Sequence, residues 1–513
     1  MSTAKSPNFE GRFGRLFRSL DAATYGPTDN DSRNALMTLG TLMTSSPLDR
    51  PKDGFDNEES GIPALYTYFG QFVDHDITFD PMTTLIKHSD PDALTDFRTP
   101  ALDLDNVYGR GPGDQPYLYD KDGLKFLLGE PLNNGAPDLP RNNPVDKSEP
   151  ARALIGDPRN DENSIVSQFQ ALMLRFHNRV ADDNKTKNLD LPALQQIVRW
   201  HYQWVVIHDF LPKIIKASVL NALKTDDGKY DQKKLEFFHW KNEPFMPVEF
   251  SVAAYRLGHS IIRPGYRLND DDGTLLPIFP VPSMGLPDGL TGFQAMAKNR
   301  GIDWGRFIDL EGDIRAYGDD PDKVKPPNTD MKRRLQFAYR LDTSVVTPLS
   351  LLPSSVASDP PPSLPQRNLL RGFELGLPTG QSVAMAMKVK PLTDEQIIIG
   401  KAVDSPSGDD VLGPLSSVPE LAPFKGKCPL WTYILAEAAN NRTSLRIPVK
   451  PAMNISTPQL GPVGGRIVAE VFLGMLFGDN DSFLSAQPDW TPSIRGKGEQ
   501  FALRDIVAYA LGK

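Results

Sequence analysis

The sequence has almost no cysteine: Cys428 is the only one among 513 residues. A single cysteine cannot form an intramolecular disulfide, and it excludes a metal site built only from cysteines. We therefore expect buried apolar side chains to stabilise the fold, with a bound ion as a further contributor, and we expect no disulfide-linked dimer. The sequence is otherwise silent on oligomeric state.

Long apolar runs are also missing. No stretch approaches the ~20 apolar residues that a transmembrane helix needs. The first twenty residues, MSTAKSPNFEGRFGRLFRSL, contain basic groups but no continuous apolar core before a small-residue cleavage site. No conventional signal peptide is therefore expected, which predicts a cytoplasmic protein or one secreted by an unconventional route.

Basic residues are slightly outnumbered, since 56 Lys and Arg against 65 Asp and Glu give a net charge of −9. No basic block stands out, which argues against nucleic acid and anionic membranes as partners. Histidine is scarce as well, with seven residues, at positions 75, 88, 177, 201, 208, 239 and 259. Any imidazole chemistry must come from this small set.

Helical periodicity dominates what is present. Apolar residues recur at spacings of three and four in residues 64–79, 164–183, 191–215 and 465–478, as is typical of helices that bury one face or more. Stretches such as EPLNNGAPDLPRNNPVD are proline-rich but carry apolar residues, which indicates stiff loops. Strand patterns are few and short. The predicted fold class is mainly α: a single large helical domain with few short strands.

Three polar residues share one face of the first predicted helix. Gln71, Asp74 and His75 stand at i, i+3 and i+4 in the run YFGQFVDHDITF, so their side chains lie on the same face. A lone histidine on an amphipathic helix is most often structural. Because buried polar groups need partners, a cluster of three in an apolar context instead indicates a lined cavity.

Four segments, in chain order, resemble the animal-type haem peroxidases of the peroxidase–cyclooxygenase superfamily, such as myeloperoxidase and lactoperoxidase. FGQFVDHDITFD resembles the family's distal-histidine helix, and GDPRNDENSIVSQFQALMLRFHNRVA resembles its Gly-Asp-x-Arg-x-x-Glu segment and following helix. AYRLGHSIIRP resembles the proximal-histidine helix, and NLLRGFELGLP a segment that runs from asparagine to Gly-Leu-Pro. One match would be weak, but four in order are specific.

The resemblance implies a catalytic domain over residues 61–513 around a buried haem b, with residues 1–60 as an N-terminal arm packing on it. The lack of disulfides and of net positive charge suggests a bacterial-style member.

The resemblance also implies a catalytic group beside the haem. His75 would be the base that moves a proton between the peroxide oxygens, since imidazole accepts and donates protons near neutral pH. Arg159 would be the fixed cation that stabilises charge as the O–O bond breaks; a surface ion pair with Asp161 or Glu162 is its alternative role. Gln71 is assigned to the same group.

On the other side of the haem, the resemblance implies His259 as the iron ligand. Its second ring nitrogen would hydrogen-bond Asn368, which is found by counting back from Gly376 of the Gly-Leu-Pro run. Arg256, three residues before His259, would reach a haem propionate.

Asp74 and Glu162 match the two carboxylates that form ester bonds with the haem in mammalian members, and hydrogen bonding in the pocket is their alternative role. Asn163 stands where the myeloperoxidase branch has a methionine that forms a sulfonium link. We therefore expect no such link here.

A calcium site is implied in the loop TPALDLDNVYG, with ligands Asp76, Thr99, Ala101 (through its carbonyl), Asp103 and Asp105. Calcium takes about six to eight oxygen ligands. On a helix Asp76 points about 100° away from the preceding histidine, so one side of the helix would face calcium and the other the haem. A solvated acidic turn is the alternative.

These assignments predict a haem peroxidase that reduces hydrogen peroxide through a ferryl intermediate and oxidises small donors or halides, in keeping with a response to oxidative stress. One alternative is a fatty-acid dioxygenase of the cyclooxygenase-like branch, which needs a tyrosine three residues before the proximal histidine. Arg256 stands there, and Tyr255 would be rotated about 100° away. The other alternative is a calcium-stabilised haem-binding or adhesive protein without turnover, against which the retained His75, Arg159 and Asn368 argue.

Overall fold

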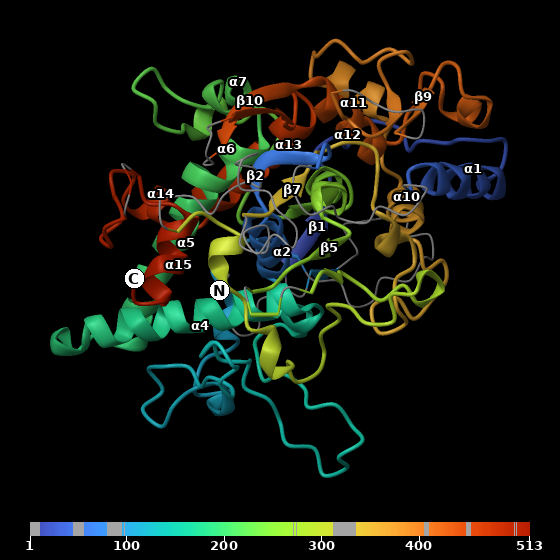
Figure 1. The fold of residues 1–513 in the computed structure, drawn as a ribbon. Coiled ribbons are helices and arrows are strands. Elements are labelled where there is room, and N and C mark those ends of the chain that lie inside the picture. Colours follow the sequence, from blue (N-terminus) through green and yellow to red (C-terminus); the bar gives the residue numbers. More distant parts are fainter. Residues whose placement is uncertain are drawn as a thin grey trace.

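A helix with almost no solvent exposure, α2 (Leu65–Ile77), lies in the middle of the molecule (Figure 1). The computed structural model describes residues 11–44, 56–78, 95–96, 98–269, 271–272, 274–310, 335–404, 410–447, 453–496, 498 and 500–513. Over these residues helices dominate and strands are short, which confirms the predicted mainly α class.

The helices vary from one turn to more than five. Their bounds are α1 Asp29–Leu42, α2 Leu65–Ile77, α3 Asp105–Tyr108, α4 Ser164–Asp183, α5 Leu191–Val205, α6 Leu211–Ile214, α7 Ala217–Asn221, α8 Val248–Ser251, α9 Gly258–Ile261, α10 Leu364–Glu374, α11 Gly380–Ala386, α12 Leu430–Asn440, α13 Gly464–Gly478, α14 Phe483–Ala486 and α15 Leu503–Ala510. Two 3₁₀ turns, η3 (Pro158–Asp161) and η7 (Ala254–Leu257), and one π-helical turn, η5 (Val206–Phe210), complete the elements that position the site.

The strands form small separate sheets. They are β1 Gly11–Gly14, β2 Glu59–Pro63, β3 Thr95–Asp96, β4 Met246–Pro247, β5 Gly265–Tyr266, β6 Leu276–Pro277, β7 Phe337–Tyr339, β8 Ile398–Gly400, β9 Val411–Pro414, β10 Arg442–Ile447 and β11 Met453–Pro458. β1 lies between β3 (antiparallel) and β4 (parallel), and the pairs β2–β7, β5–β6, β8–β9 and β10–β11 are all antiparallel.

The predicted helices agree with the structure where periodicity is strong. The segment 164–183 is α4, which Asn163 caps by accepting from the backbone N–H groups of Ile165 and Val166. The segment 465–478 lies in α13, and 64–79 contains α2. The segment 191–215 is helical but not uniform, because the π turn η5 separates α5 from α6.

Aromatic packing holds α2 in the core. Phe69 and Phe72 have no solvent exposure, and their rings meet Phe169 of α4 and Tyr202 of α5 in edge-on contacts with centroids 5.1 to 6.2 Å apart. Such contacts add to the free energy gained by burying the rings. The orientation of α2 is therefore determined by its apolar faces, and its remaining face is available for polar side chains.

The chain before α2 packs on the rest through named contacts. Phe13 and Phe17 are buried, and buried Glu249 of α8 accepts hydrogen bonds from the backbone N–H groups of Leu16 and Phe17. α1 packs against α10. Residues 1–10 and 45–55 lie outside the described residues, so the division into an arm (1–60) and a domain (61–513) stays a prediction. No helix in the described part of the chain combines the length and apolarity needed to cross a bilayer.

Candidate active site

A cavity of about 270 Å³, partly open to solvent, lies against α2. Side chains of η3, η7, α9 and α10 form further parts of its wall. The cavity brings together most of the residues that the sequence singles out, namely Gln71, Asp74, His75, Arg159, Glu162, Arg256 and His259. Asn368 lies behind His259.

The face of α2 toward the cavity carries residues 66, 67, 70, 71, 74 and 75. This series follows the i, i+3, i+4, i+7, i+8 spacing of one helical face. Gln71 and Asp74 are partly exposed to the cavity, whereas the neighbouring Phe72 and Val73 have no exposure. The polar group inferred from spacing therefore does line a cavity in the structure.

His75 is held by an amide that the motif analysis missed. Its Nδ1 lies 2.7 Å from Oδ1 of Asn160, and Asn160 Nδ2 donates to Oε1 of buried Gln170 over 2.8 Å. Since an amide oxygen only accepts, Nδ1 carries the proton and Nε2 keeps its lone pair. Burial, and next the positive charge of Arg159, lower the pKa of His75 to about 4. The ring is therefore a neutral base at neutral pH.

Arg159 is positioned by a buried carboxylate. Asp157, which has no solvent exposure, accepts from Nε and Nη2 of Arg159 over 3.1 and 2.7 Å. The same Nη2 donates to the carbonyls of His75 (3.1 Å) and Thr78 (2.6 Å), at the end of α2. The sequence suggested Asp161 or Glu162 as ion-pair partners of this guanidinium, and the structure shows an ion pair with Asp157.

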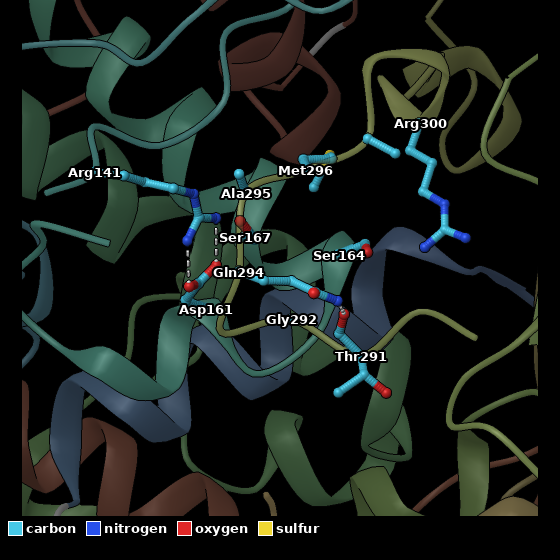
Figure 2. A pocket seen from close by; sticks show the side chains of 11 residues that line it. Arg141, Asp161, Ser164, Ser167, Thr291, Gly292, Gln294, Ala295, Met296 and Arg300 are labelled. Carbon is cyan, nitrogen blue, oxygen red and sulfur yellow. Dashed lines mark hydrogen bonds and ion pairs between the residues drawn. The ribbon is translucent and has the colours of Figure 1, made fainter. Parts of the chain in front are cut away.

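Asp161 and Glu162 are consecutive, yet they face different spaces. Asp161 pairs in bidentate fashion with Arg141, at 2.7 and 2.8 Å, in a small separate cleft (Figure 2). Glu162 lines the large cavity and accepts a hydrogen bond from Nε2 of Gln71. The ion pair with Arg141 therefore holds this segment in place from outside the cavity, while Arg159 and Glu162 of the same segment face the cavity.

The carboxyl of Glu162 is the most perturbed acid on the cavity wall. Burial raises its pKa to about 7, against the opposing effect of Arg159. Asp74 lies on the same wall, and its Oδ1 accepts from Thr78 Oγ1 at 3.4 Å. The structure therefore brings together both carboxylates that the resemblance assigns to haem ester bonds.

His259 mirrors His75. It lies on the four-residue helix α9 after the 3₁₀ turn η7, a shorter helix than the resemblance implies. Its Nδ1 is 2.7 Å from the Asn368 amide, and burial, then Arg256, lower its pKa to about 3. The atom nearest to Nδ1 is the amide nitrogen Nδ2 of Asn368, which donates to Nδ1 in this orientation. Turning the same amide by 180° would present its oxygen to a protonated Nδ1 and leave Nε2 free to act as a ligand.

Arg256 lies on the cavity wall, as assigned, while its Nε donates to the carbonyl of Ser251 over 2.8 Å. Arg256 stands three residues before His259, as expected, and Tyr255, one position away, also lines the cavity. The segment here is a short 3₁₀ turn beside a wide cavity, so a rotation of one residue does not remove a large side chain from the wall.

The predicted calcium ligands lie together beside α2. Carboxylate oxygens of Asp76, Asp103 and Asp105 are all within 4.8 Å of one another. Thr99 Oγ1 donates to Asp103 Oδ2 over 2.8 Å, and buried Ala101 occupies the turn between them.

Asp76 is the deepest member of this acidic cluster. It is fully buried, and its Oδ1 has no hydrogen-bond partner among the described residues, while Oδ2 accepts from Tyr202 at 3.1 Å. Burial and the repulsion of Asp103 and Asp105 raise its pKa well above the ordinary range. Such a cluster is stable with a cation or with bound protons.

Known proteins share parts of this chain. A family model described as animal haem peroxidase matches residues 87–283, a span that contains Arg159, Glu162 and His259 but neither His75 nor Asn368. Thyroid peroxidase of Rattus norvegicus is 30% identical over 199 residues, 35% of this chain and 21% of that protein. Dual oxidase of Drosophila melanogaster is 29% identical over 123 residues, 23% of this chain and 7% of its own. The match thus spans about a fifth or less of these relatives.

Solved structures extend the likeness to the whole fold. Peroxidase A from Dictyostelium discoideum aligns over 96% of this chain and 92% of its own, with a TM-score of 0.57 at 15% identity. Oryza sativa fatty acid alpha-dioxygenase aligns over 96% and 79%, with a TM-score of 0.50 at 16% identity. The fold is therefore of the mainly helical haem-peroxidase class. The partial family match, the thyroid peroxidase relatives and the shared fold together support the resemblance to the peroxidase–cyclooxygenase superfamily.

The bond between His75 and Asn160 leads to a testable tautomer. In the haem-free protein, nitrogen NMR of the histidine rings should show His75 as the Nδ1–H form. In Asn160→Leu the acceptor is lost, so the Nε2–H form should appear, and any peroxide activity should fall by about one to two orders of magnitude, as is usual when the partner of a functional histidine is removed. Asn143→Leu, on an exposed loop, is the control, and an unchanged tautomer in Asn160→Leu would contradict the assignment.

Glu162 gives a second prediction. Since its pKa is raised from 4.5 to about 7, the folded protein binds a proton in this window that the unfolded chain has released. Stability therefore falls as pH rises from 4.5 to 7. In haem-free Glu162→Gln this loss should be absent, so the gain in unfolding temperature over the parent protein should grow with pH across the window. Exposed Glu149→Gln should show no such trend; a pH-independent difference for Glu162→Gln would refute the shift.

Proposed function

We propose that the protein is a haem-dependent peroxidase that reduces hydrogen peroxide and oxidises small donors or halides. The observation that carries the proposal is a pair of neutral imidazoles, His75 from α2 and His259 from α9, that line one cavity. Each has its Nδ1 beside a side-chain amide, from Asn160 or Asn368. The amide oxygen of Asn160 keeps Nε2 of His75 unprotonated, and Nε2 of His259 becomes available as a ligand once the Asn368 amide turns its oxygen toward Nδ1.

The cavity wall fits a haem. A Cβ added to Gly258 would meet nothing within 4 Å, and buried Thr67 Oγ1 has no partner among the described residues. Ile278, Phe279 and Leu352 supply apolar contacts for a porphyrin. When bound, haem supplies an iron centre that binds and activates peroxide. His259 would hold that iron through Nε2, and Arg256 on the same wall suits a propionate.

The residues on α2 and η3 then act on the peroxide. Nε2 of His75, unprotonated at neutral pH, takes a proton from hydrogen peroxide and returns it to the departing oxygen. The guanidinium of Arg159, held by Asp157, stabilises the negative charge that develops there. Donation from Gln71 orients Glu162 on the same wall.

Asp74 and Glu162 are the candidate ester carboxylates. Both lie on the cavity wall, and the raised pKa of Glu162 keeps part of its carboxyl protonated and uncharged at neutral pH. Asn163 stands where the myeloperoxidase branch has its sulfonium-forming methionine, and here its side chain caps the N-terminus of α4 instead. Acid extraction of the loaded protein followed by mass spectrometry would give free haem b if no ester forms.

The role of His75 is tested by His75→Ala in the haem-loaded protein. The porphyrin absorption band should remain, because His259 is intact. The rate of reaction with hydrogen peroxide, measured by stopped-flow absorbance, should fall by about 10²–10⁴-fold, the usual contribution of a general base.

Exposed His239→Ala is the matched control and should react like the parent protein. Normal peroxide turnover in His75→Ala would remove the assignment of the base. If the parent protein takes up haem but shows no reaction with peroxide, it is a haem-binding protein without turnover instead.

The acidic cluster of Asp76, Asp103 and Asp105 is proposed to bind Ca²⁺. Three carboxylates and the hydroxyl of Thr99 supply oxygen ligands of the kind that calcium prefers, and the carbonyl of Ala101 adds to them. Asp76 follows His75 directly, so a bound cation would fix the end of α2 from the side away from the cavity.

Calcium removal gives the corresponding test. Chelation should lower the unfolding temperature, and excess Ca²⁺ should restore it; at 100 times the dissociation constant the gain is ~2.7 kcal/mol. In Asp76→Asn this calcium-dependent gain should be lost or greatly reduced, whereas exposed Asp122→Asn should keep it. If neither the chelator nor added Ca²⁺ changes the unfolding temperature of the parent protein, the cluster is not a calcium site.

A further inference from the structure

Two tyrosine side chains line the cavity, and their hydroxyl groups have different partners. Tyr255 OH donates to the backbone carbonyl of Gly70 over 3.2 Å. Tyr66 OH donates to the carboxylate of Asp209, with 2.6 Å between OH and Oδ2. A carboxylate can take the phenolic proton, whereas an amide carbonyl cannot hold it near neutral pH. Tyr66 is therefore the one of the two with a base in hydrogen-bond contact.

The carboxylate is held in place by the fold. Asp209 lies in the π turn η5, and its Oδ2 also accepts the backbone N–H of Leu503 over 2.8 Å, at the start of α15. π turns cost regular helical hydrogen bonds and occur often at functional sites. Here the turn between α5 and α6 places Asp209 against Tyr66 of α2, so three distant parts of the chain meet at this pair.

The surroundings of Tyr66 couple loss of an electron to loss of the proton. The ring is 4% exposed, and burial, then the charge of Asp209, raise the pKa of Tyr66 well above its ordinary value, so the resting phenol is protonated. Lys213 Nζ lies 5.8 Å from the ring centroid and opposes positive charge on the ring; the nearby charges of Arg504 and Asp505 have opposite signs. An oxidised ring can therefore persist only as the neutral radical, with its proton on Asp209.

We propose that Tyr66 and Asp209 form a redox-active pair that supplies one electron to the cavity when hydrogen peroxide is present and small donors are not. The reduction H₂O₂ + 2 H⁺ + 2 e⁻ → 2 H₂O needs two electrons, of which the bound haem would supply one, and two protons, which come from solvent. Tyr66 provides the other electron, its O–H bond breaks, and the proton passes to Asp209 Oδ2, which leaves a neutral tyrosyl radical. This inference rests on the proposed peroxidase function.

The test uses full-length, haem-loaded protein mixed with one equivalent of hydrogen peroxide, without a donor, and frozen for electron paramagnetic resonance. Ring-deuterated tyrosine should change the hyperfine pattern of the radical signal and so identify it as tyrosyl. Tyr66→Phe should lose that signal, and Tyr255→Phe should keep it. Asp209→Asn, which retains an oxygen acceptor for Leu503 but is no base, should give a much weaker signal.

Each outcome has a defined meaning. Circular dichroism and the porphyrin absorption band confirm that each variant is folded and loaded. An undiminished tyrosyl signal in folded Tyr66→Phe, a signal lost in Tyr255→Phe alone, or no tyrosyl signal in the parent protein despite normal consumption of peroxide overturns the proposal and leaves the peroxidase function standing. Failure of the parent protein to take up haem or react with peroxide instead overturns the proposed function, and this inference with it.

Discussion

The buried carboxylate of Asp157 is the group on which the rest of the site depends. It has no solvent exposure, and it accepts from two guanidinium groups, those of Arg159 and Arg98. Arg159 continues to the carbonyls at the end of α2, and Arg98 Nη1 lies 3.5 Å from Asp105 of the acidic cluster. The two cations hold the pKa of Asp157 well below its ordinary range despite burial. Leaving a buried carboxylate unpaired costs several kcal/mol of folding free energy. Asp157 therefore fixes the positions of both Arg159 and Arg98.

Residues of the short segment 157–163 point in different directions, and each contacts a different part of the protein. Asp157 and Arg159 form the ion pair, and Asn160 turns back to His75. Asp161 faces outward to Arg141, and Glu162 faces the cavity. A 3₁₀ turn rotates successive side chains by about 120°, so neighbours in sequence point in different directions. The same turn that carries the catalytic guanidinium is therefore anchored from outside.

The sequence predicted the long elements well because their signal is local. Residues 164–183 bury one apolar face, and this periodicity matches α4 residue for residue. Helical spacing identified the polar group on α2, but Arg159 and His259 were found only through motif resemblance, because nothing in their spacing shows that they lie near α2. The strands could not be foreseen, because β3, β4, β5 and β6 have two residues each and depend on partners far along the chain.

The residues that were missed share a reason. Asn160 and Asp209 act through hydrogen bonds to side chains more than 80 residues away, and Asp157 acts through ion pairs with Arg98 and Arg159, none of which leaves a periodic pattern in the sequence. Asp157 stands within the Gly-Asp-x-Arg-x-x-Glu segment, two residues before Arg159. A search of that segment for an acidic partner of the arginine would have identified it.

The two cavity histidines show why amides rather than carboxylates stand behind them. A carboxylate at Nδ1 would favour the protonated imidazolium, whereas an amide forms a hydrogen bond with the ring without adding a charge. With burial acting on both rings, their pKa values fall to about 4 and about 3. His75 can then receive a proton and release it again, because the protonated ring gains no ion pair with its Asn160 partner. His259 is likewise neutral, so the positive charges on the cavity wall are those of Arg159 and Arg256.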